Sequence, residues 1–301
     1  MPFADRRKFD WRLRTRSLAL GPRTLIMGIL NATPDSFSDG GQFLDPRAAL
    51  THALQMLDDG ADILDLGGES TRPNSTPITP AEEQARVLPI LRAILAARPD
   101  TILSIDTYHA STARLAIDCG AEIVNDVSGF LWDEAMAATC AALNCGTILM
   151  HTRGRPQQWR TLPALAPTEV VPLVLRELRV RANAALAAGI ARESIVLDPG
   201  FGFGKVLDEN IPLLAQFDRL GTLGFPLLAG LSRKGFLRHA LADNVPAKVT
   251  GAPHLDSEMW VSATTAANTA AILAGAHILR VHDVRPVRAA AAIADRILAT
   301  R

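Results

Sequence analysis

Residues 60–63 of the chain read GADI, and closely similar tetrapeptides return as GAEI at residues 120–123 and GAHI at residues 275–278. Each glycine follows a helix-compatible stretch and precedes an apolar run. Glycine directly after a helix supplies the left-handed conformation that ends the helix, so a strand can follow at once. A weaker version, GTI, occurs at residues 146–148. The pattern predicts a helix-to-strand unit used several times, and its irregular interval argues against a solenoid repeat.

Eight short apolar runs alternate with longer amphipathic stretches along the chain. The interiors of these runs are almost continuous Ile, Leu and Val, which is typical of parallel strands covered on both faces. The predicted strands are residues 24–30, 62–66, 101–105, 122–125, 147–151, 194–198, 226–230 and 277–282. The predicted helices are residues 46–59, 80–98, 110–119, 133–143, 167–188, 208–220, 257–274 and 284–299.

Strand–helix units in this number predict an α/β fold, a closed (β/α)8 TIM barrel in a single domain. We expect residues 1–23 to form an N-terminal lead-in segment and residues 24–301 to form the barrel. An open doubly wound sheet is the alternative, but residues 31–42 lack the GxGxxG phosphate-binding motif of that fold. Residues 242–256 are a longer connection than we expect between the seventh strand and its helix.

The composition narrows the class of protein. Hydrophobic residues make up 48% of the 301 residues and charged residues 21%, which excludes a disordered chain. Lys and Arg number 31, as do Asp and Glu, so neither nucleic acid nor an anionic membrane is an expected partner. No apolar run approaches the roughly 18–20 residues of a membrane span, and the N-terminus lacks the apolar core of a signal peptide.

Cys119, Cys140 and Cys145 have no CxxC spacing, so neither a disulfide framework nor a zinc site is expected. These features together predict a cytoplasmic protein. The basic residues between positions 6 and 16 are interrupted by aromatic and acidic ones, and we interpret this segment as a solvated lead-in strand or arm.

Polar side chains follow nearly every predicted strand. In a barrel the carboxyl ends of the strands meet at one mouth, where the active site lies. Burying so many polar groups there without a ligand would be costly, so we expect a ligand site. These positions are Asn31, residues 69–72, Asp106, Asn125, Asp126, His151, Asp198, residues 232–234, Arg280 and His282.

Two Gly/Ser/Asp/Pro-rich loops, residues 31–41 and 67–73, carry Phe37 and Arg72. Bulky apolar and cationic residues in such loops favour lids that close over a substrate rather than simple turns. Both loops follow predicted strands and so belong to the expected mouth of the barrel.

The segment 198–205 contains glycines that let the backbone approach a flat ligand, and Phe203 can pack beside one. Asp106, Asn125 and Asp198 together offer acceptors and one mixed donor–acceptor group. That set suits a heterocycle with several N–H donors and a carbonyl, such as a guanine-like or pterin ring.

Arg280 and His282 alternate in the last predicted strand, so both side chains can face the mouth and bind an anion. The alternative for Arg280 is a structural salt bridge with Asp283. We favour the anion site because barrels commonly hold a phosphate near their last two strands.

At these residues the sequence closely resembles the dihydropteroate synthase family, the pterin-binding barrel enzymes of folate biosynthesis. The resemblance runs from about residue 24 to residue 286. It is carried by GILNATPDSFSDGG (28–41), DLGGESTRP (65–73), SIDT (104–107), NDV (125–127), LDPGFGFGK (197–205), SRK (232–234) and RVHDV (280–284). One departure is Thr152, where many members have methionine.

The resemblance implies a homodimeric enzyme that condenses 6-hydroxymethyl-7,8-dihydropterin diphosphate with 4-aminobenzoate, using Mg²⁺. It implies Asn31 as the magnesium-linked residue. The implied substrate-binding residues are Thr71, Asp106, Asn125, Asp198, Phe203, Ser232, Lys234, Arg280 and His282, and the implied catalytic residues are Asp106, Lys234, Arg280, His282 and Arg72. Thr71, Arg72, Phe203 and Ser232 correspond to the aminobenzoate side.

Two other functions remain open at this point. A corrinoid-linked methyltetrahydrofolate methyltransferase shares a pterin-binding barrel, but it needs neither the first lid loop nor a diphosphate pocket. A non-catalytic pterin-binding barrel would be signalled by loss of Lys234, Arg280 or His282, and all three are present.

Overall fold

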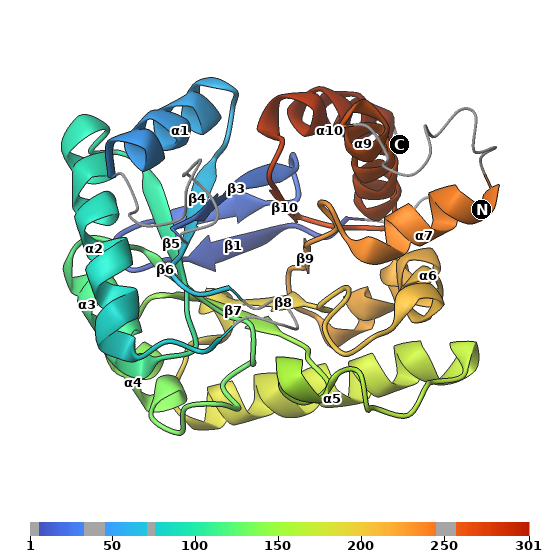
Figure 1. Cartoon of the computed structure of the whole chain (residues 1–301), viewed down its shortest axis with the longest axis horizontal. Coiled ribbons are helices and arrows are strands. Elements are labelled where there is room, and N and C mark those ends of the chain that lie inside the picture. Colours follow the sequence, from blue (N-terminus) through green and yellow to red (C-terminus); the bar gives the residue numbers. More distant parts are fainter. Residues whose placement is uncertain (1–5, 33–45, 71–75, 245–256, 301) are drawn as a thin grey trace.

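The computed structural model describes residues 6–32, 46–70, 76–244 and 257–300, in which parallel strands form a barrel surrounded by helices (Figure 1). The barrel strands are β3 (Leu25–Asn31), β4 (Ile63–Gly67), β5 (Ile102–Asp106), β6 (Ile123–Asp126), β7 (Gly146–Met150), β8 (Ile195–Asp198), β9 (Leu228–Ala229) and β10 (Ile278–Val281). The α-helices are α1 (Pro46–Asp58), α2 (Pro80–Ala97), α3 (Ala110–Asp118), α4 (Met136–Leu143), α5 (Pro167–Ala187), α6 (Asn210–Ala215), α7 (Gly235–Asn244), α9 (Ser257–Leu273) and α10 (Val284–Leu298).

The strands pair in the order β8-β7-β6-β5-β4-β3-β10-β9, all parallel. A parallel bridge between Leu197 and Leu227 joins the two ends of this order, and the Leu197 N–H donates to the carbonyl of Pro226 at 3.0 Å. The ring therefore closes. The predicted (β/α)8 barrel is confirmed, and the open doubly wound sheet is excluded.

The glycine junctions behave as the sequence predicts. Gly60, Gly120 and Gly275 have φ angles of 99°, 111° and 102°, the region that favours glycine. The weaker junction differs, because Asn144 and not Gly146 takes the left-handed conformation after α4. Asparagine tolerates that conformation better than most other residues.

Two elements depart from the expected pattern. The predicted helix 208–220 is divided into a 3₁₀ turn at Leu207–Glu209, the short helix α6, and a second 3₁₀ segment at Phe217–Leu223. A continuous helix from residue 208 would place Pro212 where an N–H donor is required, whereas α6 has this proline in its first turn. Helix α7 was not expected, and most of the long connection 242–256 lies outside the described residues.

The N-terminal segment closes one end of the barrel. Strands β1 (Phe9–Arg12) and β2 (Ser17–Leu20) form an antiparallel hairpin. Trp11, Leu13 and Leu20 are buried against an apolar cluster at the amino ends of the barrel strands. The Trp11 indole also donates to the carbonyl of Ser194 at 3.0 Å.

The segment contains a strand, as expected, and its basic residues other than Arg6 are exposed to solvent, but its apolar residues are packed on the barrel. Arg12 and Arg14 lie on the exposed side of the hairpin, while Trp11 and Leu13 alternate with them on the buried side. The period of two residues in an extended chain produces this division.

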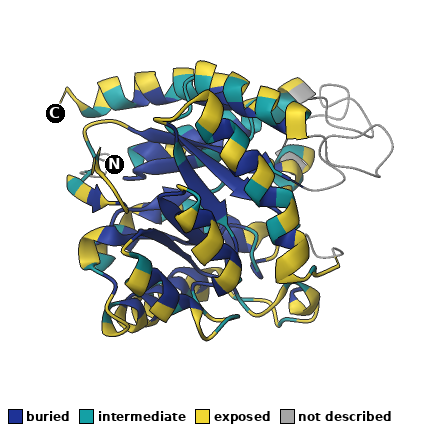
Figure 2. Ribbon diagram, turned by 90° about the vertical axis from the view of Figure 1, so that its left-hand side faces the viewer, coloured by how far each residue is buried: buried dark blue, intermediate teal, exposed yellow. Residues whose placement is uncertain are grey.

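The barrel interior is layered along its axis. Figure 2 shows the strands almost entirely buried and the helices exposed along their outer faces. The layer next to the hairpin is apolar and is formed by Met27, Ile63, Ile123, Ile148, Val196, Leu228 and Ile278. Two residues further along, β4, β6, β8 and β10 carry the polar residues Asp65, Asn125, Asp198 and Arg280, whereas β3 and β7 carry Ile29 and Met150. The polar side chains of the barrel interior therefore gather toward its carboxyl end. Cys119, Cys140 and Cys145 are free thiols. None of the described helices is long and apolar enough to span a membrane.

Candidate active site

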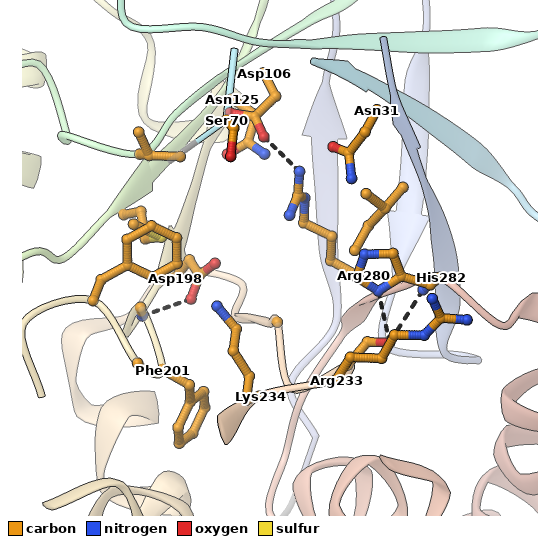
Figure 3. A pocket seen from close by; sticks show the side chains of 18 of the residues that line it. Asn31, Ser70, Asp106, Asn125, Asp198, Phe201, Arg233, Lys234, Arg280 and His282 are labelled. Carbon is orange, nitrogen blue, oxygen red and sulfur yellow. Dashed lines mark hydrogen bonds and ion pairs between the residues drawn. The ribbon is translucent and has the colours of Figure 1, made fainter. Parts of the chain in front are cut away.

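A cavity of about 720 Å³ opens at the carboxyl ends of the strands, and nearly every barrel strand contributes to its wall. It brings together twelve of the residues singled out from the sequence: Asn31, Glu69, Ser70, Asp106, Asn125, Asp198, Phe203, Ser232, Arg233, Lys234, Arg280 and His282. Figure 3 labels all of these except Glu69, Phe203 and Ser232. Thr71 and Arg72 lie outside the described residues, as do Phe37 and most of the first predicted lid.

Arg280 stands at the centre of the strongest charge network in this cavity. Its Nε donates to Oδ2 of Asp65 at 2.6 Å, and an amino nitrogen of the guanidinium donates to Oδ2 of Asp106 at 2.5 Å. The salt bridge with Asp283 considered from the sequence is therefore not formed. Asp283 instead pairs with Arg233 at 2.8 Å.

Burial and neighbouring charges in this network change the pKa values of Asp106 and Arg280. Burial raises the pKa of Asp106 to about 7; the charge of Arg280 opposes this shift and that of Asp65 adds to it. Burial alone would lower the pKa of Arg280, but the charges of Asp65 and Asp106 outweigh it and raise that pKa. The guanidinium thus stays protonated between two carboxyl groups, a permanent cation in the wall of the cavity.

The opposite wall carries Asp198 and Lys234. Asp198 is buried, as expected for a carboxylate at the end of an apolar strand, and Oδ1 accepts the N–H of Gly200 at 2.7 Å. Figure 3 shows the Lys234 side chain extended toward Asp198. Burial raises the pKa of Asp198, while the Gly200 N–H and the Lys234 charge oppose the rise. Burial lowers the pKa of Lys234 to about 8, against the attraction of Asp198.

The aromatic ring of Phe203 also lines the cavity, next to Lys234. The Lys234 ammonium lies 4.2 Å from the ring centroid of Phe203, a cation–π contact. The indole of Trp159 meets the same ring edge-on, with centroids 5.2 Å apart. Phe203 is therefore held between two neighbours and offers a fixed apolar surface to a flat ligand.

Ser232 and His282 are joined at the end of the last strands. The Ser232 hydroxyl accepts the backbone N–H of His282 at 3.2 Å and lies 3.0 Å from Nδ1 of the same residue. This pair of contacts fixes the imidazole at the cavity wall beside Arg280 (Figure 3).

His151, in contrast, does not reach the cavity. It is wholly buried behind the wall, with Nδ1 2.9 Å from Lys205 Nζ and Nε2 3.1 Å from Glu177. Burial, with the charge of Lys205, lowers the pKa of His151 to about 3. His151 therefore lies behind the cavity wall, where it contacts Lys205 and Glu177, and does not line the cavity.

Asn31 ends β3, is half-buried, and lines the cavity that Arg280 and His282 also line. Mg²⁺ prefers oxygen ligands and is commonly held by one or two protein groups together with substrate phosphates and waters. Asn31 offers a single amide oxygen in the same cavity as Arg280 and His282, whose side chains can donate hydrogen bonds to an anion. The residues therefore fit a magnesium ion that binds together with a diphosphate.

A second polar cluster adjoins the cavity. Ligand atoms of Glu69, Glu83 and His109 lie within 4.8 Å of one another. They are already bonded: Tyr108 donates to Glu69 at 2.7 Å, Thr107 donates to Glu83 at 2.8 Å, and His109 Nδ1 lies 3.1 Å from Glu83. These contacts anchor Glu69 in the cavity wall.

Sequence reasoning missed Asp65, Lys205 and Trp159. Asp65 had a signal, since an acidic residue interrupts the otherwise apolar strand ILDLG at residues 63–67. Lys205 and Trp159 had none, because their partners come from other elements of the barrel.

Comparison with known proteins agrees with this geometry. The model of the family described as pterin binding enzyme matches residues 27–282. The dihydropteroate synthase of Clostridium beijerinckii is 39% identical over 288 residues, which is 95% of this chain and 99% of the relative. A solved Yersinia pestis dihydropteroate synthase with a sulfonamide drug complex has a TM-score of 0.84 at 36% identity, covering 97% of this chain and all of that one.

A Xanthomonas albilineans dihydropteroate synthase solved with 4-aminobenzoic acid has a TM-score of 0.82 at 38% identity, covering 99% of this chain and 98% of that one. Identity at this level extends over almost the whole length of both chains, and the folds superpose. The chain therefore belongs to the dihydropteroate synthases of the pterin-binding enzyme family.

Proposed function

We propose that this chain condenses 6-hydroxymethyl-7,8-dihydropterin diphosphate with 4-aminobenzoate at the barrel mouth, giving 7,8-dihydropteroate and pyrophosphate. The observation that carries the proposal is one cavity that combines buried acceptors with fixed cations. In the reaction the C–O bond to the diphosphate breaks, its electron pair leaves with pyrophosphate, a C–N bond forms, and the arylamine releases a proton.

Asp198 and Asn125 are suited to hold the pterin ring. Both are buried in the cavity wall, where a carboxylate and an amide match ring N–H donors and acceptors. Lys234, beside Asp198, adds a donor for the ring carbonyl. The electron-rich ring can share positive charge at the reacting carbon, and Asp106 and Asp198 stabilise that charge.

Arg280 and His282 are suited to hold the diphosphate. As the C–O bond breaks, negative charge grows on the leaving oxygens, and fixed donors stabilise that state more than the ground state. Asn31 would hold Mg²⁺, which when bound neutralises further charge on the leaving diphosphate.

Phe203 and Ser232 are suited to position 4-aminobenzoate, together with Thr71 and Arg72 from the loop outside the described residues. The arylamine is weakly basic, so it needs positioning more than a strong general base. The ring of Phe203, fixed by Trp159 and Lys234, supplies such positioning.

The corrinoid-linked methyltransferase and the non-catalytic barrel have no observation in their favour. The relatives reported above are dihydropteroate synthases. The cations that a methyltransferase would not need line the cavity.

Pyrophosphate release tests the proposal. We expect release only with both substrates and Mg²⁺, and loss of release after chelation of the metal. Calorimetry should show that Asp198→Ala abolishes binding of the pterin diphosphate in a folded protein, whereas Asp218→Ala on the exposed surface does not. Wild-type affinity in Asp198→Ala would refute the pterin assignment.

A homodimer and a cytoplasmic location are further parts of the proposal, supported by the family resemblance. Sedimentation equilibrium of the purified chain tests the first, and cell fractionation tests the second.

A further inference from the structure

Asp65 lies inside the barrel, level with its register partner Ile29, which lines the cavity although Asp65 does not. It occupies the middle of β4, has no exposed surface, and pairs in register with Ile29 on one side and Ser104 on the other. The apolar layer that includes Ile63 lies beneath it. A carboxyl group in such a place is costly unless charged and polar neighbours bind it.

One oxygen of Asp65 meets both neighbours. Oδ2 accepts from Arg280 Nε at 2.6 Å and from Asn125 Nδ2 at 2.9 Å. The other oxygen, Oδ1, is buried and has no hydrogen-bond partner among the described residues. Among the described residues, the side chain of Asp65 therefore hydrogen-bonds only to two residues of the proposed substrate site.

The contact with Arg280 fixes the plane of the guanidinium. Nε is held by Asp65 and one amino nitrogen by Asp106, so rotation about the side-chain bonds is blocked from two directions. A guanidinium has five N–H donors, and these contacts use two of them. The remaining donors are available to diphosphate oxygens in a fixed orientation.

The contact with Asn125 fixes the direction of its amide. Because Nδ2 donates to Asp65, the carbonyl oxygen Oδ1 is turned away from Asp65 and remains available as an acceptor. Asn125 lines the cavity, so this orientation decides which face of the amide a ring can meet. Reversal of the amide would set two hydrogen-bond acceptors against each other at Asp65.

We propose that Asp65 is a positioning residue that aligns Arg280 toward the diphosphate and Asn125 toward the pterin ring. This role rests on the proposed function, since it acts through two residues of the same site. Asp65 itself does not line the cavity and need not touch the substrate. Its effect is selective, because the aminobenzoate side of the cavity is not among its contacts.

The test compares Asp65→Asn with Ser104→Ala. The first removes the charge at nearly constant shape, while the second changes the register partner of Asp65, whose hydroxyl has no hydrogen-bond partner among the described residues. We expect Asp65→Asn to lower kcat/KM for the pterin diphosphate at least tenfold and to weaken its binding in calorimetry. The KM for aminobenzoate should change less than twofold, and Ser104→Ala should keep wild-type kinetics.

Wild-type constants in folded Asp65→Asn would overturn the proposal, as would a loss equal for both substrates. If Asp65→Asn does not fold, Asp65→Ser is measured in the same way, and failure of both to fold would assign Asp65 to folding alone and overturn the positioning role. Wild-type enzyme that releases no pyrophosphate would instead refute the proposed function, so the two failures are distinct.

Discussion

The Nζ atom of Lys205 lies 2.9 Å from Nδ1 of His151, and both side chains are buried behind the cavity wall. Lys205 also donates to the carbonyl of Phe203 at 3.1 Å. Since the pKa of His151 is lowered to about 3, its imidazole is neutral at pH 7, with Nδ1 next to Lys205 and Nε2 3.1 Å from Glu177. The pair ties the loop that carries Phe203 to the strand that precedes His151.

Replacing Lys205 with methionine should change how stability depends on pH. Burial lowers the pKa of Lys205 well below its ordinary value, so the unfolded chain binds more protons than the folded one between that lowered pKa and about 10.5. Stability of the wild type relative to Lys205→Met must therefore rise with pH in this window, by up to about 1.4 kcal/mol per pH unit.

Urea denaturation of both proteins at pH 7, 8 and 9 measures this difference. Lys8→Met, at an exposed lysine, controls for the loss of a lysine as such. If the free energy of unfolding changed equally with pH in the wild type and in Lys205→Met, the buried amine would keep its proton in the folded state and the prediction would be wrong.

Replacing Arg280 with alanine should act mainly on turnover. Loss of one charged hydrogen bond costs about 1.5–3 kcal/mol, or about ten- to a hundredfold. Because charge builds on the diphosphate as its bond breaks, we expect kcat to fall at least tenfold, with a smaller change in KM for the pterin diphosphate. Unpaired Asp65 and Asp106 should also lower Tm.

Arg288→Ala is the matched control. Arg288 pairs with Asp62 and donates to the carbonyl of Gly60 at 3.0 Å, outside the wall of the cavity. It should lower Tm while leaving kcat near wild type. A similar result for Arg280→Ala, lower Tm with unchanged kcat, would make Arg280 a scaffold residue.

The dependence of kcat/KM on pH should reflect the ionisation of Lys234. Its pKa of about 8 in the free enzyme means that the cation is lost as pH rises through 8. We expect kcat/KM for the pterin diphosphate to fall above that pH. Lys234→Arg keeps its charge there, so its profile should stay level above pH 8 at a lower absolute value. An alkaline limb at the same pH in both proteins would assign the limb to another group.

Two neighbouring glycines should differ sharply in their tolerance of alanine. Gly200 and Gly202 have φ angles of 65° and 80°, so alanine is strained at both by about 1–2 kcal/mol. A Cβ on Gly200 would lie 2.0 Å from the carbonyl oxygen of His151, whereas on Gly202 the nearest contact is Lys234 Cδ at 3.4 Å.

We expect Gly200→Ala to lose several kcal/mol of unfolding free energy, because the clash with backbone adds to the strain. Gly202→Ala should lose only about the strain itself. Chemical denaturation compares the two, and equal losses would mean that the loop shifts freely away from His151.

The sequence alone determined the features that depend on neighbouring residues. Glycine after a helix decides the junctions at Gly60, Gly120 and Gly275, and continuous apolar runs decide the parallel strands. Asp106, Asn125, Asp198 and Arg280 each lie at or near the carboxyl end of a predicted strand. Because the parallel strands of a barrel all end on the same side, the sequence also places these four residues at one mouth of the barrel.

Only the tertiary structure decided which of these groups bind each other. Arg280 pairs with Asp65 and Asp106, which are 215 and 174 residues away, and not with Asp283 nearby, because β10 pairs with β3 and β3 with β4, which brings Arg280 close to β4 and β5. The burial of Trp11 against the barrel and the contact of Lys205 with His151 likewise join residues that are distant in the sequence. Local pattern specifies which face a side chain takes, but its partner depends on how distant strands are arranged around the ring.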